Sequence, residues 1–284
     1  MTIEATNLQW LPFDTDCISI YCETLSDTVA ISYNTNGGKD KGGNTITYKS
    51  INQAPNKQIV LQGGDMYNEN KLFAWTDSQG NKYNYGDMYT IPNNNTTLTA
   101  QWIAGNEVTV TNTLPTDSTV EFQSMSPSRC LIRYDDNEVV RRNTNAISTF
   151  KKNYSLGTHD TTIVSESDDL TNFDNAFDKG TTTKIDCSKV KATYLTSPMG
   201  NGFENITDFV FPANLANIST SEGVLSGCKK LTNIAFPTAY CDISHPESFL
   251  ANSTFVNGLE LPYTLTFVLS LIHISEPTRP RLIS

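Results

Sequence analysis

Histidine and basic residues are scarce in this chain of 284 residues, which has 3 histidines and 20 lysines and arginines against 30 acidic residues. The formal charge is therefore −10, and the pI is near 4.7. A nucleic-acid partner requires a basic footprint against its phosphates, so this charge argues against that class of function. The two basic pairs, Arg141-Arg142 and Lys151-Lys152, are interpreted as parts of a solvated face.

The six cysteines include no CxxC pair, so they offer no common framework for a structural metal site. Cys17 and Cys22 are five residues apart, so on a strand they would face opposite sides and make poor partners. Cys130 and Cys241 receive no role from the sequence. We predict no metal site, and no cofactor is implied.

The chain also lacks a convincing catalytic constellation. A serine-type triad needs a base that an orienting acid holds. His245 stands beside Pro246 on a predicted loop, and the side chains of His159 and Asp160 would point apart in an extended loop. We therefore expect no enzyme activity. The paired acids lack the glycine-punctuated spacing of a calcium loop, and we interpret them as solvated turns; they are Asp14 and Asp16, Asp135 and Asp136, and Asp168 and Asp169.

Long apolar runs and targeting signals are absent as well. The apolar stretch at residues 265–272 is far shorter than the roughly 20 residues that a membrane-spanning helix needs. The start of the chain has neither the positive region nor the apolar segment of a secretion signal. The motif LPYTL at residues 261–265 lacks the glycine of an LPxTG sorting signal. We expect neither a membrane span nor an anchor in this chain.

The segment Leu269 to Ser284, LSLIHISEPTRPRLIS, resembles a translated sequencing adapter. The transposon-end oligonucleotide reads LSLIHISEPTR in this frame. We treat these residues as non-native and exclude them from the argument on fold and function, which also removes His273 from the candidate bases.

What the sequence does contain is a repeat. The segments NITDFVFP, KLTNIAFP and FVNGLELP end in Pro212, Pro237 and Pro262, which are each 25 residues apart. A fixed period of this size predicts a solenoid. Two apolar columns before each proline are spaced by two residues, which predicts one short strand per coil with both side chains on one face. The apolar columns are Ile206, Leu231 and Val256; Phe209, Ile234 and Leu259; and Phe211, Phe236 and Leu261.

The same register predicts the rest of each coil. Alternation places the intervening residues on the outer face, where we predict the binding residues: Asp208, Val210, Asn233, Ala235 and Glu260, with Gly258 beside them. The apolar return side pairs Ile218 with Ile243, Val224 with Phe249 and Leu225 with Leu250, and Glu222 also matches Glu247. A weaker coil is expected one repeat earlier, with Ile185 and Cys187 at a spacing of 24. Cys228 is expected to be a small core residue.

The repeat also resembles a known family. GCKKLTNIAFP at residues 227–237, together with Ala176 and Phe177, is similar to the BspA-type leucine-rich repeat of bacterial surface proteins. The resemblance covers Asn172 to Thr264. Leu225 and Ser226 stand where the family usually has Ala-Phe, and Ser253 replaces the repeat cysteine.

A second resemblance lies upstream, between Val29 and Trp102. ISYNTNGG, LFAW, GNKYNYG and TTLTAQW follow one another in the order of the Listeria–Bacteroides repeat, which is similar to the internalin B-repeat, a small β-grasp-like unit. Ala74 replaces the usual glycine, and Thr99 replaces the usual tyrosine. Asn36-Gly37-Gly38 predicts a tight turn, because positive φ is easily adopted there. Trp75 and Trp102 are interpreted as core residues, and Tyr83, Tyr85 and Tyr89 as one face of a sheet or an exposed stripe.

The sequence therefore predicts a mainly β chain with a β-grasp-like module followed by a leucine-rich-repeat solenoid with a parallel strand ladder. The resemblances imply an extracellular or cell-surface protein, adhesin-like, that presents its repeat surface to a host or microbial protein or glycan. The alternatives are a non-catalytic accessory region of a secreted hydrolase and a structural stalk. We expect the chain to be a fragment. The expected segments are the end of a preceding β-region at 1–28, the repeat module at 29–102, a β-rich linker or degenerate first repeat at 103–171, the solenoid at 172–268 and the non-native tail at 269–284.

Overall fold

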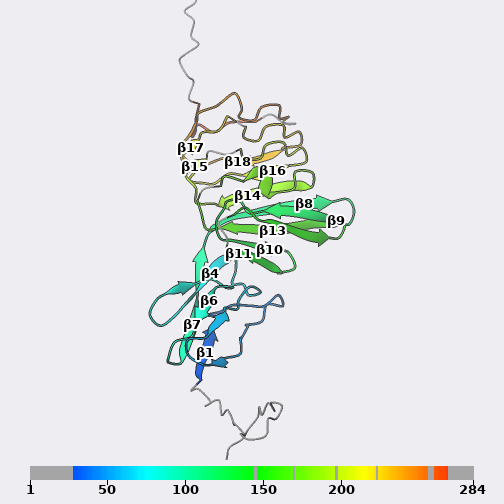
Figure 1. The fold of residues 1–284 in the computed structure, drawn as a ribbon. Coiled ribbons are helices and arrows are strands. Elements are labelled where there is room, and N and C mark those ends of the chain that lie inside the picture. The colour runs from blue at the N-terminus through cyan, green and yellow to red at the C-terminus, as the bar shows by residue number, and fades with distance from the viewer. Residues whose placement is uncertain are drawn as a thin grey trace, which may run out of the picture.

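The computed structural model describes residues 28–143, 146–168, 170–195, 198–221, 223–254 and 259–267. Within these ranges the chain is almost entirely β-structure, and its one helical element is the 3-10 turn η1 at Asp174–Ala176. Figure 1 shows three parts in succession: a small module in blue and cyan, a green antiparallel part, and coils from yellow-green to orange. The mainly β fold with a solenoid and a parallel ladder is confirmed. No helix in the described ranges has the length and apolar character to cross a membrane.

The first module is a mixed sheet with the strand order β2-β1-β7-β4-β5. Its two neighbours β1 and β7 run parallel, and its other pairs are antiparallel. A separate antiparallel pair, β3 and β6, lies beside the sheet. The strands are β1 Val29–Asn34, β2 Ile51–Gln53, β3 Gln58–Val60, β4 Lys71–Thr76, β5 Lys82–Tyr83, β6 Met88–Thr90 and β7 Thr96–Ala104.

Both tryptophans of the module organise its interior. Trp75 is fully buried, and its indole nitrogen donates to the carbonyl of Gln62 at 2.6 Å. Trp102 is half-buried and donates to the carbonyl of Asn36 at 2.9 Å, which fixes the predicted turn. That turn has a φ of 47° at Asn36 and 85° at Gly37, as expected for an Asn-Gly turn. The core interpretation of Trp75 is confirmed. The tyrosine stripe is not exposed, because Tyr89 is buried and the other two tyrosines are half-buried.

The middle part consists of antiparallel strands rather than a solenoid coil. Its strand β8 also pairs with β14, the first strand of the solenoid, so that one sheet runs through both parts in the order β11-β10-β13-β8-β14-β16-β18. The strands of this part are β8 Asn106–Leu114, β9 Ser118–Gln123, β10 Cys130–Tyr134, β11 Val139–Arg142, β12 Thr149–Tyr154 and β13 Gly157–Ser165.

The solenoid has a parallel ladder on each of two sides. The first ladder contains β14 Thr182–Lys189, β16 Asp208–Val210 and β18 Asn233–Ala235. The return ladder contains β15 Tyr194–Leu195, β17 Asn217–Ile218, β19 Cys241–Ile243 and β20 Leu265–Phe267. In the first ladder Phe209 pairs with Ile185 and with Ile234, which confirms the spacings of 24 and 25.

The predicted third strand of the first ladder is only partly within the described ranges. Val256 and Gly258 lie outside them, and the described residues 259–261 form no strand. Leu261, predicted to point inward, is 45% exposed, so that prediction is wrong. The described residues 259–261 do not pair with β18, so the strand alternation that would direct the Leu261 side chain toward the core is not present.

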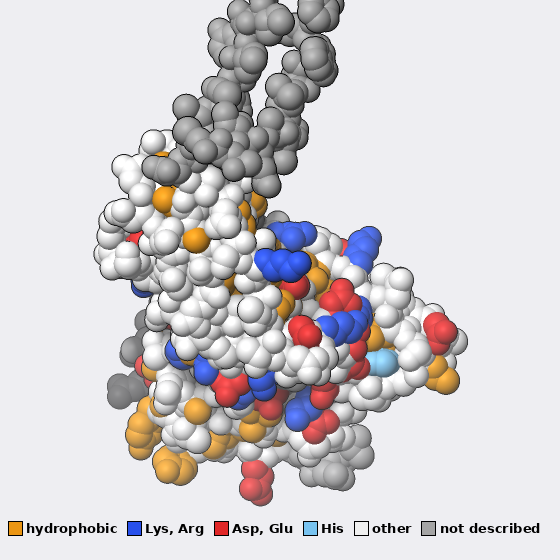
Figure 2. Space-filling model, turned by 90° about the horizontal axis from the view of Figure 1, so that it is seen from below, with side chains coloured by type: hydrophobic (Ala, Val, Ile, Leu, Met, Phe, Trp, Pro, Cys, Tyr) orange, Lys and Arg blue, Asp and Glu red, His pale blue; other side chains and the backbone are white. Residues whose placement is uncertain are grey.

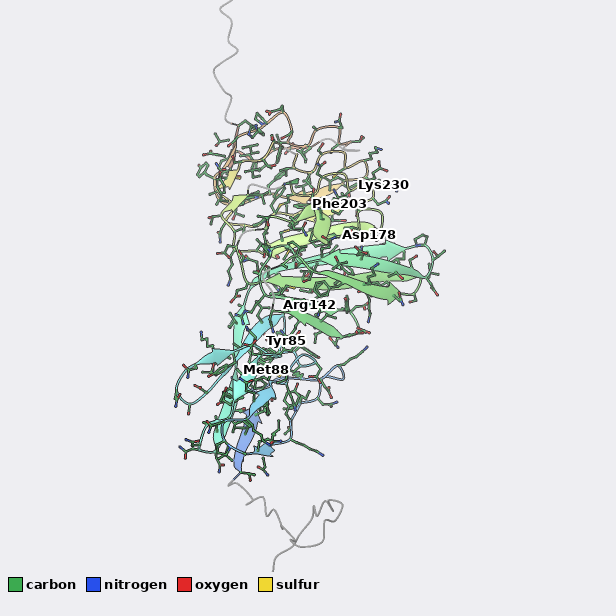
Figure 3. The ribbon with its side chains drawn as sticks, viewed as in Figure 1. Tyr85, Met88, Arg142, Asp178, Phe203 and Lys230 are labelled. Atoms are coloured by element: carbon green, nitrogen blue, oxygen red, sulfur yellow. The ribbon has the colours of Figure 1, made fainter. Side chains whose placement is uncertain are left out.

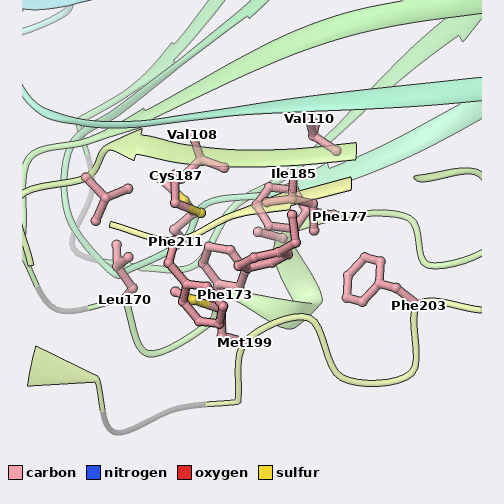
Figure 4. Close-up of a cluster of buried hydrophobic side chains, with 14 of the residues drawn as sticks. Val108, Val110, Leu170, Phe173, Phe177, Ile185, Cys187, Met199, Phe203 and Phe211 are labelled. Atoms are coloured by element: carbon pink, nitrogen blue, oxygen red, sulfur yellow. The ribbon is translucent and has the colours of Figure 1, made fainter. Parts of the chain in front are cut away.

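One apolar core runs from the antiparallel part into the coils. Val108 and Val110 of β8 belong to the same buried cluster as Ile185, Phe203 and the three aromatic residues Phe173, Phe177 and Phe211 (Figure 4). The antiparallel part therefore covers the end of the solenoid, as a capping unit of a repeat protein does.

The first module is joined to the middle part through a buried arginine. Arg141 was predicted on a solvated face, and this is wrong: the residue is 3% exposed. Its guanidinium donates to the carbonyl of Met66 at 2.7 Å and lies 4.9 Å from the ring centre of Phe73. Burial lowers the pKa of Arg141 to about 10. Figure 3 labels Tyr85 and Arg142 at this joint. The Tyr85 hydroxyl donates to the carbonyl of Arg141 at 2.7 Å.

Candidate functional site

The candidate site is the outer face of the seven-stranded sheet, which we call the sheet face. Strand β8 shows why it forms: its alternating sequence buries Val108 and Val110 in the core and leaves Thr109 and Thr111 outside. Strand pairing places two rows of outer residues side by side. One row is Asp160, Thr111, Lys184, Asp208 and Asn233; the other is Arg133, Thr162, Thr109, Asp186, Val210 and Ala235.

Four of the five predicted binding residues lie together on this face. Asp208 and Val210 are half-buried on β16, and Asn233 and Ala235 are exposed on β18. The Asn233 amide donates to the Asp208 carboxylate at 2.7 Å across the two strands. Glu260 is exposed but belongs to no described strand, so the structure does not bring it together with the other four.

The larger part of the sheet face was not predicted. Lys184 and Asp186 flank Ile185, whose inward position was predicted, so the same alternation could have placed both of them outside. Thr109 and Thr111 follow the alternation of the segment EVTVTNTL. What the sequence could not show is that β8 lies against β14, because an antiparallel pairing between segments so far apart leaves no periodic signal.

Two adjoining hollows lie on the sheet face, with volumes of about 190 and 310 Å³. Both are lined by Glu107, Thr109, Asp160 and Lys189, so they form one shallow groove along β8. Ligand pockets usually occupy about 300–1,000 Å³ and enclose most of the ligand. A groove of this size and polarity is suited to surface contact rather than to enclosing a substrate.

Most charged groups along the groove are already paired within the protein. The Thr111 hydroxyl donates to the Asp160 carboxylate at 2.6 Å. The Glu107 carboxylate accepts from the Lys189 ammonium at 2.8 Å and from the Asn70 amide at 2.7 Å. Figure 2 shows acidic and basic side chains interspersed over one face of the molecule, without a large area of one sign.

His159 lies in strand β13, not in the loop that was predicted. Its Nδ1 is 2.7 Å from an Asp135 oxygen, its Nε2 is 2.9 Å from the Ser155 carbonyl oxygen, and its ring stacks on Tyr154. Burial disfavours its charged form, but the bonds to Asp135 and Ser155 outweigh burial and raise the pKa of His159. Asp160 bonds to another strand, so the two neighbours do point apart, as predicted. With both ring nitrogens engaged in this way, His159 does not face a serine nucleophile.

The other candidate catalytic or metal-binding side chains also contact neighbouring groups of the protein. His245 is on a loop, as predicted, and its Nδ1 is 3.2 Å from a Glu247 oxygen. Partial burial would raise the pKa of Asp136, but the ammonium groups of Lys152 and Lys41 hold it well below its usual range. In the described part of the chain, no three His, Cys, Asp or Glu side chains are grouped as metal ligands would be. Asp14, Asp16 and Asp169 lie outside that part.

The four described cysteines are free and buried. Cys228 packs in the core as predicted, and its thiol donates to the carbonyl of Gly200 at 3.1 Å. Burial raises the pKa of Cys130 and of Cys241 to about 11, so these thiols are poor nucleophiles at neutral pH. Cys17 and Cys22 lie outside the described ranges.

Comparison of the chain with protein-family models, with curated proteins and with solved structures found no match. The resemblances to the BspA-type and Listeria–Bacteroides repeats therefore stay expectations from the sequence.

Proposed function

We propose that the chain is an adhesin-like binding region of a bacterial cell-surface or secreted protein, and that the sheet face meets a protein or glycan partner. The observation that carries the proposal is the continuity of the sheet. Strands of the antiparallel part and of the first ladder hydrogen-bond into one surface, so a partner can contact both parts at once. Repeat proteins use such extended surfaces for contact.

The chemistry of the sheet face favours many weak contacts over one strong one. Its charges are balanced and largely paired, so each offers little net attraction to a partner. Several strands contacted together, and several copies of the face in one larger assembly, would raise the avidity without new contacts. The proposed partner is therefore extended, such as a matrix protein or a mucin glycan.

Charge reversal on the face tests the proposal. Lys184 is exposed between Thr111 and Asp208, and Lys184→Glu would add one carboxylate beside those of Asp186 and Asp208. Binding to immobilised extracellular-matrix proteins should fall at least about tenfold, which corresponds to about 1.4 kcal/mol. Lys57→Glu, an equal charge change on an exposed residue of the first module, should leave binding unchanged.

Equal binding by both variants and the unchanged protein would reject the sheet face as the site. The same samples should be assayed for hydrolysis of polysaccharides and peptides. Turnover that is lost in His159→Asn or His245→Asn would replace the binding proposal with an enzyme.

A structural stalk is the second candidate, and the joint around Arg141 favours it. Arg129 extends this joint, because its guanidinium bonds to Asn84 of the first module at 2.8 Å and to Glu166 of the middle part. Such contacts hold the module and the sheet as one body. A rigid spacer would show no partner binding at any face, which is the result that separates it from the first proposal.

A further inference from the structure

The return ladder carries the exposed aromatic residues of the described chain. Tyr194, Tyr240 and Tyr263 are 54%, 70% and 86% exposed, and they are the aromatic members of the exposed large apolar side chains in the described ranges. Tyr194 belongs to β15, Tyr240 immediately precedes β19, and Tyr263 lies just before β20. Three exposed rings on one side of a solenoid differ from single surface tyrosines, because a ligand could contact them together.

Two of these rings are neighbours. The ring centres of Tyr240 and Tyr263 are 6.4 Å apart, with an angle of 70° between the rings. Backbone pairing supports this proximity, because the Cys241 amide donates to the Thr264 carbonyl at 2.8 Å. Within the described part of the chain neither phenol hydroxyl has a hydrogen-bond partner. The pair therefore offers ring faces and hydroxyl groups to a ligand.

A row of polar side chains starts at Tyr194 and runs beside the other two tyrosines; the side-chain oxygen of its Asn217 is buried, so the exposed acceptor of the row is Asp242. Strand pairing aligns Tyr194 with Asn217, Asn217 with Asp242, and Asp242 with Thr266. Neighbouring strands are about 4.8 Å apart, so the row is about 14 Å long. We call the three tyrosines and this row the tyrosine face.

The acid in this row differs from those of the sheet face. The Asp242 side chain is exposed, and among the described residues it makes no ion pair or hydrogen bond. Asp160 and Asp208, by contrast, accept bonds from Thr111 and Asn233. The carboxylate of Asp242 is therefore available to accept hydroxyl groups from a ligand, whereas the sheet-face carboxylates already have partners.

These groups match the chemistry of a sugar chain. A pyranose ring has an apolar C–H face, which packs on an aromatic ring, and a rim of hydroxyls, which donate to carboxylate oxygens. Asp242 and the formal charge of −10 would repel sialylated or sulfated glycans. A neutral ligand avoids that repulsion.

We infer that the tyrosine face binds a neutral oligosaccharide of several units, with Tyr240 and Tyr263 stacking on sugar rings and Asp242 accepting hydroxyl groups. This second site goes beyond the function proposed for the sheet face. It does not depend on the sheet face, because the two sites lie on different ladders.

Calorimetry with chito-oligosaccharides, cello-oligosaccharides and galactose-terminated mucin-core glycans tests the inference on the full chain. At least one neutral series should bind, and its sulfated or sialylated counterpart should bind at least about tenfold more weakly. Tyr240→Ala and Tyr263→Ala should each weaken binding by about tenfold or more, and Tyr240→Phe should keep most of it. Asp242→Asn should reduce binding of the neutral glycan but also reduce discrimination against the acidic one.

Controls distinguish this site from the sheet face. Lys184→Glu should leave oligosaccharide binding unchanged, and circular dichroism should show that the exposed tyrosine variants are folded. The inference is overturned if none of these glycans binds, if the tyrosine variants bind as the unchanged chain does, or if Tyr240→Ala abolishes binding of a protein partner only.

Discussion

Polar residues on successive coils of the solenoid bond to counterparts one repeat away. Lys229 and Lys230 reach Glu204 and Asn205 at 2.7 and 2.8 Å, and the Thr232 hydroxyl donates to the Thr207 carbonyl at 3.1 Å. Each pair is 25 residues apart in sequence. Water screens exposed pairs of this kind, so they align the coils more than they stabilise them.

His159 gives a pH-dependent prediction at the residue scale. Because its pKa is raised in the folded chain, its contribution to stability is complete below the ordinary histidine pKa of about 6.5 and is lost as pH rises through the raised value. The free energy of unfolding should therefore fall over that range, by less than about 1 kcal/mol for an ion pair of this exposure. Urea unfolding at several pH values measures it.

Asp135→Asn is the matched variant, because it removes the negative charge 2.7 Å from the imidazole and keeps the shape of the side chain. The loss of stability with rising pH should shrink in this variant. An undiminished pH dependence would show that another group is responsible.

At the scale of the strand, the first ladder separates a buried face from an outer one. Phe209 is 1% exposed and packs edge-on against Phe211, whereas its neighbour Val210 points outward. Phe209→Ala should therefore lower the free energy of unfolding by about 3–5 kcal/mol. Val210→Ala, on the same strand, should cost less than about 1 kcal/mol. Denaturant unfolding of both variants decides whether the register is correct, and equal losses would contradict it.

The repeat period made the strand pairing of the first ladder predictable. The antiparallel part has no such period, so its strand pairing could not be predicted. Pairing of Phe209 with Ile234 follows from a period of 25, and the position of Ile185 follows from the spacing of 24. The antiparallel strands β8 to β13 have no such period, so the sequence showed their β character but not their partners. Four predicted binding residues therefore share one face of the sheet, whereas Lys184 and Thr111 beside them were not predicted.

Two errors of prediction have a common physical origin. Arg141 was assigned to solvent because of its charge, yet two carbonyl groups and the Phe73 ring replace water around its guanidinium. Leu261 was assigned to the core because of its apolar side chain, yet it is exposed. Residue type alone predicts burial well only where the neighbouring segments are known.

At the scale of the whole molecule, the buried Arg141 side chain couples the first module to the antiparallel part. Arg141→Ala would leave the carbonyl groups of Met66 and Lys71 without their donor and open space beside Phe73. We expect a loss of about 1–3 kcal/mol and separate thermal transitions for the first module and the remainder. Arg142→Ala is the control, because this neighbouring side chain is exposed. Calorimetry that shows the same single transition in both variants would contradict coupling through Arg141.

The continuity of the seven-stranded sheet underlies both the fold and the proposed sheet face. Amide hydrogen exchange tests it most directly, because amides that open in one cooperative unit exchange with the same free energy and the same response to denaturant. The account predicts that the amides of β8, β14 and β16 share one opening free energy, close to that of global unfolding. Opening of β14 and β16 as a separate unit, while β8 stays protected, would contradict a sheet that joins the antiparallel part to the solenoid.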